Sequence, residues 1–281
     1  MTATLASLPP LKAVIDKHGL LARKSLGQHF LLDSRITDRV AAYAGDITGH
    51  SVVEVGPGPG GLTRSLLAAG AKHVYVIEKD ERCLGVLNEI KDVADGRLTI
   101  LMGDALEVDI TREIPGPRKV VANLPYNVGT LLLTNWLDAL ASQGTSAFDS
   151  LTLMFQKEVA ERITAVPDTR DYGRLSVFAQ WLTEVRYDYE LPPGAFVPPP
   201  KVSSAVVTLI PRARPLVDVP QEALEKVVAK AFGQRRKMLR QALKGLAVPA
   251  EMLLEKAGVD GTRRAETLKL EEFCALAAAL A

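Results

Sequence analysis

Short apolar runs alternate with longer amphipathic segments along the first two thirds of the chain. Each run is too short for a helix and is rich in Val, Ile and Leu, which is typical of a buried strand. Because strands that alternate with helical segments form βαβ units, the pattern predicts an α/β fold with a parallel sheet and right-handed crossovers. The expected strands cover residues 51–55, 74–77, 98–102, 120–122 and 151–155, and two later ones cover 187–190 and 205–210.

The last quarter of the chain has a different pattern. Residues 211–220 contain three prolines and are typical of a linker, and the chain is helical in character from Gln221 onward. Breaks are expected near Gly245, Gly258 and Gly261. The sequence therefore predicts two domains: an α/β domain at 1–211 with an N-terminal extension at 1–20, and a smaller all-helical domain at 212–281.

Composition narrows the class of protein. The 281 residues include 34 Lys and Arg against 33 Asp and Glu, and 47% are hydrophobic. This excludes an intrinsically disordered chain and a globally basic nucleic-acid coat, but it allows a local basic face. Cys83 and Cys274 are too far apart for a Cys-x-x-Cys motif, and the four histidines lack metal-ligand spacing, so we expect no metal. With no signal peptide and no membrane span visible, we expect a cytoplasmic protein.

The glycine-rich loop after the first strand indicates where a ligand binds. In open parallel sheets, ligands bind beyond the carboxyl ends of the strands. The loop carries Gly56, Gly58 and Gly60 with GxGxG spacing, not the GxGxxG of a pyrophosphate cradle, which argues against an NAD-dependent oxidoreductase. It suits a ligand held by an amino-acid portion. Glu78, at the end of the second strand, can accept both hydroxyls of a ribose, and Asp104 can accept from an adenine amino group. An acid at the position of Glu78 fits dinucleotides and S-adenosylmethionine alike.

The segment Asn123-Leu-Pro-Tyr126 follows the fourth strand. One reaction that this segment could serve is methylation of an exocyclic amine on a base. Such an aryl amine is a poor nucleophile because its lone pair is delocalised into the ring, and two hydrogen-bond acceptors can favour a pyramidal nitrogen. The side-chain oxygen of Asn123 and the carbonyl of Leu124 could be these acceptors, while Tyr126 stacks on the base. Phe196, in a stiff proline-rich loop, could cover the other face of the base. The alternative for Phe196 is a plug in the core.

A basic stretch lies near the start of the helical domain. Residues 230–244 hold six basic residues and no acid, in contrast to a net charge of +1 for the whole chain. The i, i+4 spacing of Arg236 and Arg240 predicts a shared helix face that binds phosphates. The residues proposed for this role are Arg23, Lys24, Arg235, Arg236, Lys237 and Arg240.

Taken together, the motifs resemble the ribosomal RNA adenine N6-dimethyltransferase family, and within it the bacterial small-subunit type. The segments LARKSLGQHFL, EVGPGPGGLT, NLPYN, QKEVAERI, YGRLSV, FVPPPKVSSAV and FGQRRKMLRQAL occur in one order. The resemblance covers about Leu21 to Phe273. It implies a Rossmann-like S-adenosylmethionine-dependent methyltransferase domain at 1–211 and an RNA-binding helical domain at 212–281.

The resemblance also implies a reaction and a partner. Methyl groups would pass from S-adenosylmethionine to N6 of two adjacent adenines near the 3′ end of small-subunit (16S) ribosomal RNA. This would leave S-adenosylhomocysteine and N6,N6-dimethyladenosines in a 30S subunit or its precursor. We expect a monomer. The alternatives are a large-subunit RNA methyltransferase of the antibiotic-resistance type and a mainly structural ribosome-assembly factor.

The cofactor contacts implied by the resemblance follow the same motifs. They are His29, Leu31, Gly56, Gly58, Glu78, Asp104 and Asn123. One position departs from the family pattern, because many relatives carry Asn where this chain has His29. Histidine can still donate or accept a hydrogen bond there.

Overall fold

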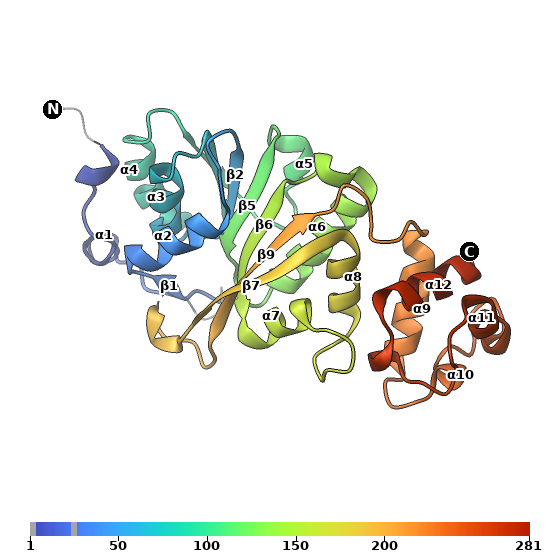
Figure 1. Ribbon diagram of the computed structural model, residues 1–281. Helices are drawn as coiled ribbons and strands as arrows, with labels where there is room; N and C mark the ends of the chain where they lie inside the picture. Colours follow the sequence, from blue (N-terminus) through green and yellow to red (C-terminus); the bar gives the residue numbers. More distant parts are fainter. Residues whose placement is uncertain (1–3, 24–26) are drawn as a thin grey trace. The chain divides into compact units, whose positions relative to one another are not determined.

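The computed structural model describes residues 4–23 and 27–281, which divide into two compact units (Figure 1). The first comprises the chain to Ala160 together with Arg186–Pro211, and the second comprises Glu161–Val185 and Arg212–Ala281. The single boundary expected between 211 and 212 therefore matches only one of the places where the chain changes unit. Residues 161–185, which we expected in the first domain, pack with the C-terminal helices.

A seven-stranded sheet forms the centre of the first unit. Neighbouring strands among β4, β3, β2, β5 and β6 are parallel, and β9 runs antiparallel to β6. The predicted α/β fold with parallel βαβ units is thus confirmed, with an antiparallel addition at one side. In order across the sheet, the strands are β4 (Leu98–Met102), β3 (His73–Glu78), β2 (Ser51–Val55), β5 (Arg118–Asn123), β6 (Ser150–Gln156), β9 (Ser204–Pro211) and β7 (Thr183–Leu191).

Helices cover the sheet of the first unit (Figure 1). The N-terminal extension is part of this covering, because Leu11 and Val14 are buried and the Arg64 guanidinium donates to the carbonyl of Pro9 over 2.7 Å. The helices are α1 (Leu11–His18), α2 (Ser34–Tyr43), α3 (Gly61–Ala68), α4 (Leu84–Lys91), α5 (Ile110–Glu113), α6 (Gly129–Gln143) and α7 (Lys157–Thr164), which continues into the second unit.

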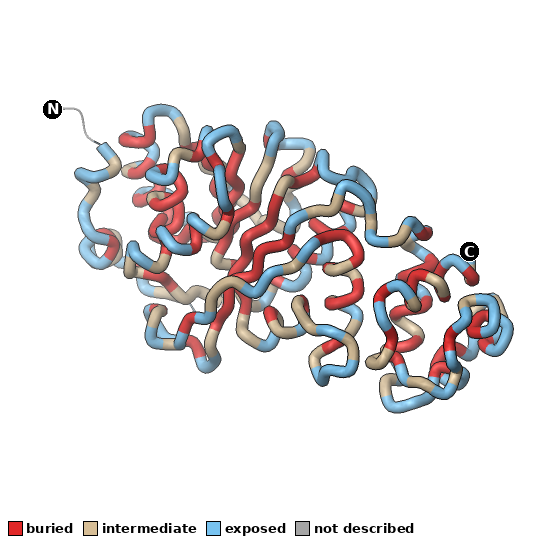
Figure 2. The backbone as a smooth tube through the Cα atoms, viewed as in Figure 1, coloured by how far each residue is buried: buried red, intermediate tan, exposed pale blue. Residues whose placement is uncertain are grey.

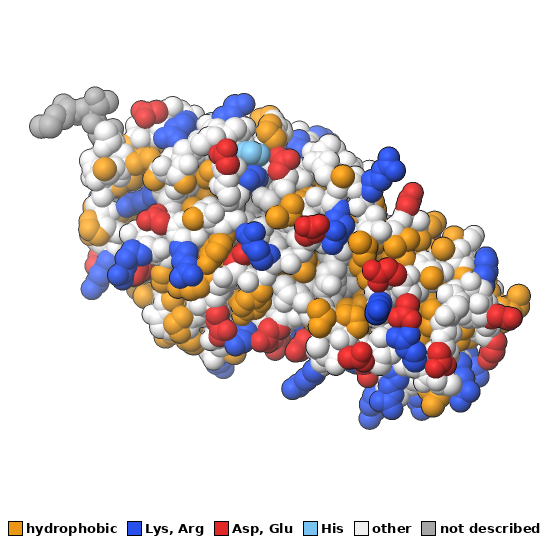
Figure 3. Space-filling model, in the orientation of Figure 1, with side chains coloured by type: hydrophobic (Ala, Val, Ile, Leu, Met, Phe, Trp, Pro, Cys, Tyr) orange, Lys and Arg blue, Asp and Glu red, His pale blue; other side chains and the backbone are white. Residues whose placement is uncertain are grey.

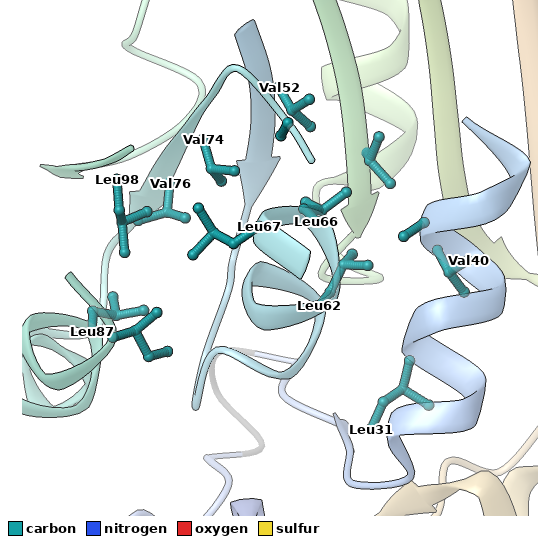
Figure 4. Close-up of a cluster of buried hydrophobic side chains, with 14 of the residues drawn as sticks. Leu31, Val40, Val52, Leu62, Leu66, Leu67, Val74, Val76, Leu87 and Leu98 are labelled. Atoms are coloured by element: carbon teal, nitrogen blue, oxygen red, sulfur yellow. The ribbon is translucent and has the colours of Figure 1, made fainter. Parts of the chain in front are cut away.

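The core of the first unit explains why the apolar runs become strands. All five residues of β2 are buried, and Figure 2 shows the central strands buried along most of their length. Helix α3 packs its apolar side on this surface, and removal of these side chains from water stabilises the layered arrangement. Figure 4 shows part of this cluster, including Val52, Val74 and Val76 from the strands and Leu62, Leu66 and Leu67 from α3.

A second, very short sheet was not predicted. Strand β1 (Phe30–Leu31) pairs antiparallel with β8 (Phe196–Val197), and Leu31 lies opposite Phe196. This pairing joins the GQHFL turn to the proline-rich loop. Short 3-10 helices complete the regular structure at Leu5–Ser7, Glu81–Cys83, Gly144–Ser146, Pro193–Ala195 and Ala265–Thr267.

The second unit is built from helices, apart from the first residues of β7. The ring of Phe232 stacks on that of Phe273, with centroids 5.5 Å apart, and meets Tyr172 edge-on at 6.0 Å. These rings join the segment before α8 to the C-terminal helices. In chain order the helices are α8 (Arg174–Leu182), α9 (Gln221–Gly233), α10 (Leu239–Ala242), α11 (Ala250–Ala257) and α12 (Leu270–Leu280). Within the described part of the chain, no helix combines the length and apolar character needed to cross a bilayer.

Candidate active site

A cavity of about 210 Å³ lies in the first unit, at the carboxyl ends of the parallel strands. The GQHFL turn, the glycine loop, Glu78, Asp104 and the Asn-Leu-Pro-Tyr segment all contribute to its wall. The prediction that the strand ends share one edge of the sheet is therefore confirmed. The predicted site residues that line the cavity are His29, Leu31, Gly56, Gly58, Glu78, Asp104, Asn123, Leu124 and Tyr126.

The glycine loop adopts a backbone that other residues rarely allow. Gly58 has φ +54° and Gly60 has φ +80°. A Cβ on Gly58 would lie 3.0 Å from the Phe30 ring, and one on Gly60 would lie 2.2 Å from the side chain of Ile90. Glycine is thus required by both conformation and space. The loop brings its backbone to the cavity wall just before α3 begins.

Glu78 is a buried carboxylate held by the backbone. Its Oε2 accepts from the Gly58 amide at 3.0 Å, and its Oε1 accepts from the Lys79 and Asp80 amides at 2.9 and 2.8 Å. Burial raises the pKa of this carboxyl, and the three amides oppose that rise. Since a carboxylate offers about four acceptor positions, these three hydrogen bonds leave one position for a ligand hydroxyl.

Asp104 is already engaged with a cation at the cavity wall. Its Oδ2 accepts from the Lys79 ammonium at 2.7 Å, and its Oδ1 accepts from the Leu106 amide at 3.0 Å. The hydrogen bond from Lys79 lowers the pKa of the Asp104 carboxyl. The side chain therefore remains an acceptor, and Lys79 joins it in the lining.

Glu54 is a lining residue that the sequence marks only as an acid at a strand end, with no contact assigned to it. It is 2% exposed, and its Oε2 accepts from the Thr63 hydroxyl at 2.6 Å. Burial raises the pKa of the Glu54 carboxyl to about 8. The side chain accordingly holds a proton at neutral pH.

The Asn-Leu-Pro-Tyr segment presents two acceptors at the cavity. The Asn123 side-chain amide donates from Nδ2 to the carbonyl of His29 at 3.2 Å. Because a carbonyl only accepts, this bond orients the amide and leaves Oδ1 without a donor among the described residues. No described residue donates to the carbonyl of Leu124. The next carbonyl, that of Pro125, accepts from the Gly129 amide at 3.0 Å and so fixes the turn to α6.

Tyr126 is held at both its hydroxyl and its ring. Its Oη lies 2.5 Å from Ser204 Oγ, and its ring stacks on His29 with centroids 5.3 Å apart and planes at 29°. Burial raises the pKa of Tyr126, so the phenol is neutral. His29 Nδ1 donates to the carbonyl of Pro198 at 2.8 Å, which fixes how this histidine faces the proline-rich loop.

The position of Phe196 contradicts its expected role. The side chain is 2% exposed, belongs to the buried apolar cluster and does not line the cavity. Its backbone pairs with Leu31. The ring thus packs in the core beside the β1–β8 pair and offers no free face to a base. The alternative that we considered for it, a plug in the core, is what the structure shows.

Gln28 ties the N-terminal segment to the strand that carries Glu78. Its Nε2 donates to Asp80 at 3.0 Å, and its Oε1 accepts from the Arg23 amide at 2.9 Å. Arg82 donates to the same Asp80 carboxylate, whose pKa falls to about 2 because of that pairing. It also donates to the carbonyl of Leu21 at 3.0 Å. Sequence reasoning missed Gln28, although it lies inside the GQHFL motif.

The basic segment of the second unit differs from the predicted stripe. Helix α9 ends at Gly233, so Arg236 lies in a turn and Arg240 lies in α10. The prediction of a shared helix face is therefore wrong, but Arg236, Lys237 and Arg240 are all exposed. Figure 3 shows Lys and Arg side chains gathered near α10.

Arg235, by contrast, is used inside the second unit. Its guanidinium donates to the carbonyls of Arg170 at 2.5 Å and Thr169 at 3.3 Å, and it pairs with Glu266 at 3.4 Å. In the first unit Arg23 is exposed, and Lys24 lies outside the described residues. Among the described residues, no group of three or more His, Cys, Asp or Glu side chains could hold a metal ion.

Comparisons with known proteins agree with the motifs. The family model described as ribosomal RNA adenine dimethylase matches residues 19–281. The ribosomal RNA small subunit methyltransferase A of Brucella canis is 56% identical over 276 residues, with 98% of each chain covered. The protein of the same description from Rhizobium etli is 57% identical over 279 residues, with 99% of this chain and all of the relative covered.

Solved structures give a similar result. A dimethyladenosine transferase from Plasmodium falciparum has a TM-score of 0.75 at 26% identity, with 88% of this chain and 96% of that chain covered. The 23S rRNA methyltransferase ErmE has a TM-score of 0.65 at 26% identity, with 89% and 99% covered. The chain belongs to the ribosomal RNA adenine dimethylase family of methyltransferases.

Proposed function

We propose that this chain transfers methyl groups from S-adenosylmethionine to N6 of two adjacent adenines near the 3′ end of small-subunit ribosomal RNA. The products are N6,N6-dimethyladenosines and S-adenosylhomocysteine, and the substrate is a 30S subunit or its precursor. The observation that carries the proposal is the pair of unoccupied acceptors, Asn123 Oδ1 and the Leu124 carbonyl, beside the glycine loop. The names of the relatives from Brucella canis and Rhizobium etli support the small subunit as the target.

The cavity fits S-adenosylmethionine in the chemistry of its lining. Gly56 and Gly58 line the cavity with backbone alone, which allows close approach of the ligand's amino-acid portion. Glu78 keeps an acceptor position for one ribose hydroxyl, and Asp104 can accept from the adenine amino group. When bound, the cofactor supplies a methyl group on a positively charged sulfur, which is a strong electrophile.

The chain's own contribution is to position the adenine amine. In the first transfer, Asn123 Oδ1 and the Leu124 carbonyl accept the two N–H groups, and this favours the pyramidal nitrogen whose lone pair can attack; in the second transfer, one of these acceptors holds the single N–H that remains. Tyr126 stacks on the base and holds the ring plane. Catalysis then rests on orientation and electrostatics, with no strong base required, because the methylated ammonium loses its proton after transfer.

The target adenine has to leave its stack to reach this cavity. The exposed cations Arg236, Lys237 and Arg240 of the second unit are suited to the RNA backbone, and their contribution should weaken as salt rises. We infer that RNA shape and the state of the subunit, more than base contacts, select the site.

The test is transfer of tritium from labelled S-adenosylmethionine to under-methylated 30S subunits, followed by nucleoside analysis. We expect label in dimethyladenosine of the small-subunit RNA, located by primer extension. The similarity to the 23S rRNA methyltransferase makes 50S subunits the necessary comparison. Label confined to large-subunit RNA would overturn the proposal, and binding of subunits without any transfer would indicate a structural assembly factor.

A further inference from the structure

Tyr126 makes its shortest polar contact with a residue from a distant strand. Its Oη lies 2.5 Å from the Oγ of Ser204. Ser204 is fully buried and begins β9, where it pairs with Gln156 of β6. It does not line the cavity. Ser204 therefore contacts the Tyr126 hydroxyl from outside the cavity.

Ser204 lies in a well-packed strand, so its hydroxyl has a fixed position. Its strand is buried from Ser204 to Leu209, and the neighbouring carbonyl of Ser203 accepts from the Lys157 amide at 2.9 Å. Tyr126, in contrast, lies in the turn between β5 and α6. A turn alone leaves an aromatic side chain free to change its rotamer. The hydrogen bond to Ser204 and the stack on His29 restrict that freedom.

We propose that Ser204 is a positioning residue for methyl transfer, which holds the Tyr126 ring at the orientation needed to stack on the target adenine. This inference rests on the proposed function. Ser204 touches neither cofactor nor base, and it acts only through the Tyr126 hydroxyl. Nearly all of its effect should therefore appear in the rate of transfer, with little in cofactor binding.

A double-mutant cycle between Ser204→Ala and Tyr126→Phe tests this directly. Either change removes the same hydrogen bond, so each should lower kcat by about five- to tenfold. The double variant should lose no more than the single variants, because the bond can be lost only once. The KM for S-adenosylmethionine should stay at the wild-type value, since Ser204 lies outside the cavity lining.

A matched control separates positioning from general stability. Thr152→Val removes another fully buried hydroxyl, from β6, whose partner is Thr208 at 3.3 Å. It should lower the melting temperature without lowering kcat. If Ser204→Ala does not fold, Ser204→Cys replaces it, because a thiol is close in shape to a hydroxyl and is a weaker hydrogen-bonding group. The Cys variant should show a smaller loss of kcat, and none beyond that of Tyr126→Phe when combined with it.

The outcomes distinguish this inference from the proposed function. If the wild-type chain methylates no adenine, the proposed function fails. If the wild type is active but the Ser204 variants keep its kcat, only the positioning role fails. Effects that multiply in the double variant, or a KM for S-adenosylmethionine that rises with each loss of kcat, would also overturn that role.

Discussion

The cavity of the first unit and the basic surface of the second are built in opposite ways. In the cavity, polar side chains are already bonded to the protein: Glu78 accepts three amides, and the Asn123 amide is oriented by a carbonyl. On the basic surface, Arg236, Lys237 and Arg240 are exposed, and no hydrogen bond or close ion pair is seen for their side chains among the described residues, although Arg240 acts electrostatically on Asp260.

This difference matches the ligands that the two regions would take. Methyl transfer depends on reacting atoms held within a fraction of an ångström, so the groups around the cavity must be fixed before the ligand arrives. A phosphate backbone can be met by flexible side chains, because its attraction is long-range and tolerant of geometry.

The largest effect is expected at Asn123. Asn123→Ala removes one of the two acceptors proposed for the adenine amine and should lower kcat by about 10²- to 10³-fold. The affinity for 30S subunits should remain close to wild type. Single-turnover transfer of labelled methyl groups, with subunit binding measured in parallel, checks both expectations.

Asn135→Ala is the matched control, because Asn135 is an exposed asparagine on the following helix, α6. Its rate should equal that of the wild type. A near wild-type rate in Asn123→Ala would show that the amine is positioned by other groups, and the catalytic role assigned to the Asn-Leu-Pro-Tyr segment would then be wrong.

On the basic surface, a tenfold effect on the affinity for 30S subunits is expected. Neighbouring residues should differ, because some would contact RNA and another stabilises the unit. The double change Arg236→Ala and Lys237→Ala should weaken 30S binding by about tenfold at moderate salt and lower the salt slope by about two. The melting temperature should not change. Filter binding over a series of salt concentrations measures the affinity and the slope together.

Arg235→Ala is the informative neighbour, because its guanidinium holds the carbonyls of Thr169 and Arg170. It should lower the melting temperature by roughly 2–4 °C and leave the salt slope nearly unchanged. If Arg235→Ala altered the slope as much as the double variant does, the division into a structural and an RNA-facing arginine would be refuted.

The same contrast explains how far the sequence could be interpreted. The range of β2 was predicted without error, because three of its five buried residues are valines and a glycine-rich loop follows it directly. The strand ends then brought Glu78, Asp104 and Asn123 together, since topology alone places the carboxyl ends of parallel strands on one edge. For these residues at the strand ends, the sequence pattern and the observed fold agree.

The errors fall where tertiary contacts decide. Strands β1 and β8 have two residues each, too few to show any periodicity. Phe196 looked available in a proline-rich loop, but pairing with Leu31 buries it. The basic run looked helical through Arg240, although the chain leaves the helix after Gly233. The partner of a lone Ser or Gln cannot be deduced from its neighbours in sequence, so Ser204 and Gln28 were missed.

The last effect is one on stability alone, and it concerns how the buried acid Glu54 in the cavity wall responds to pH. The pKa of Glu54 is raised to about 8 in the folded protein, while an unfolded chain has the ordinary value of 4.5. Between these values the folded state holds a proton that the unfolded state has released. The free energy of unfolding should therefore fall as pH rises from 5 to 8.

Glu54→Gln removes this titration and keeps the size of the side chain. Relative to wild type, its melting temperature should improve by roughly 5 °C more at pH 8 than at pH 5. Some pH dependence should remain, because burial raises the pKa of Glu78 as well. The control is Glu81→Gln, which changes an exposed acid in the same unit and should follow the wild-type curve. Parallel curves for wild type and Glu54→Gln would mean that Glu54 is ionised in the folded protein, and the cavity wall would then carry a buried negative charge facing the ligand.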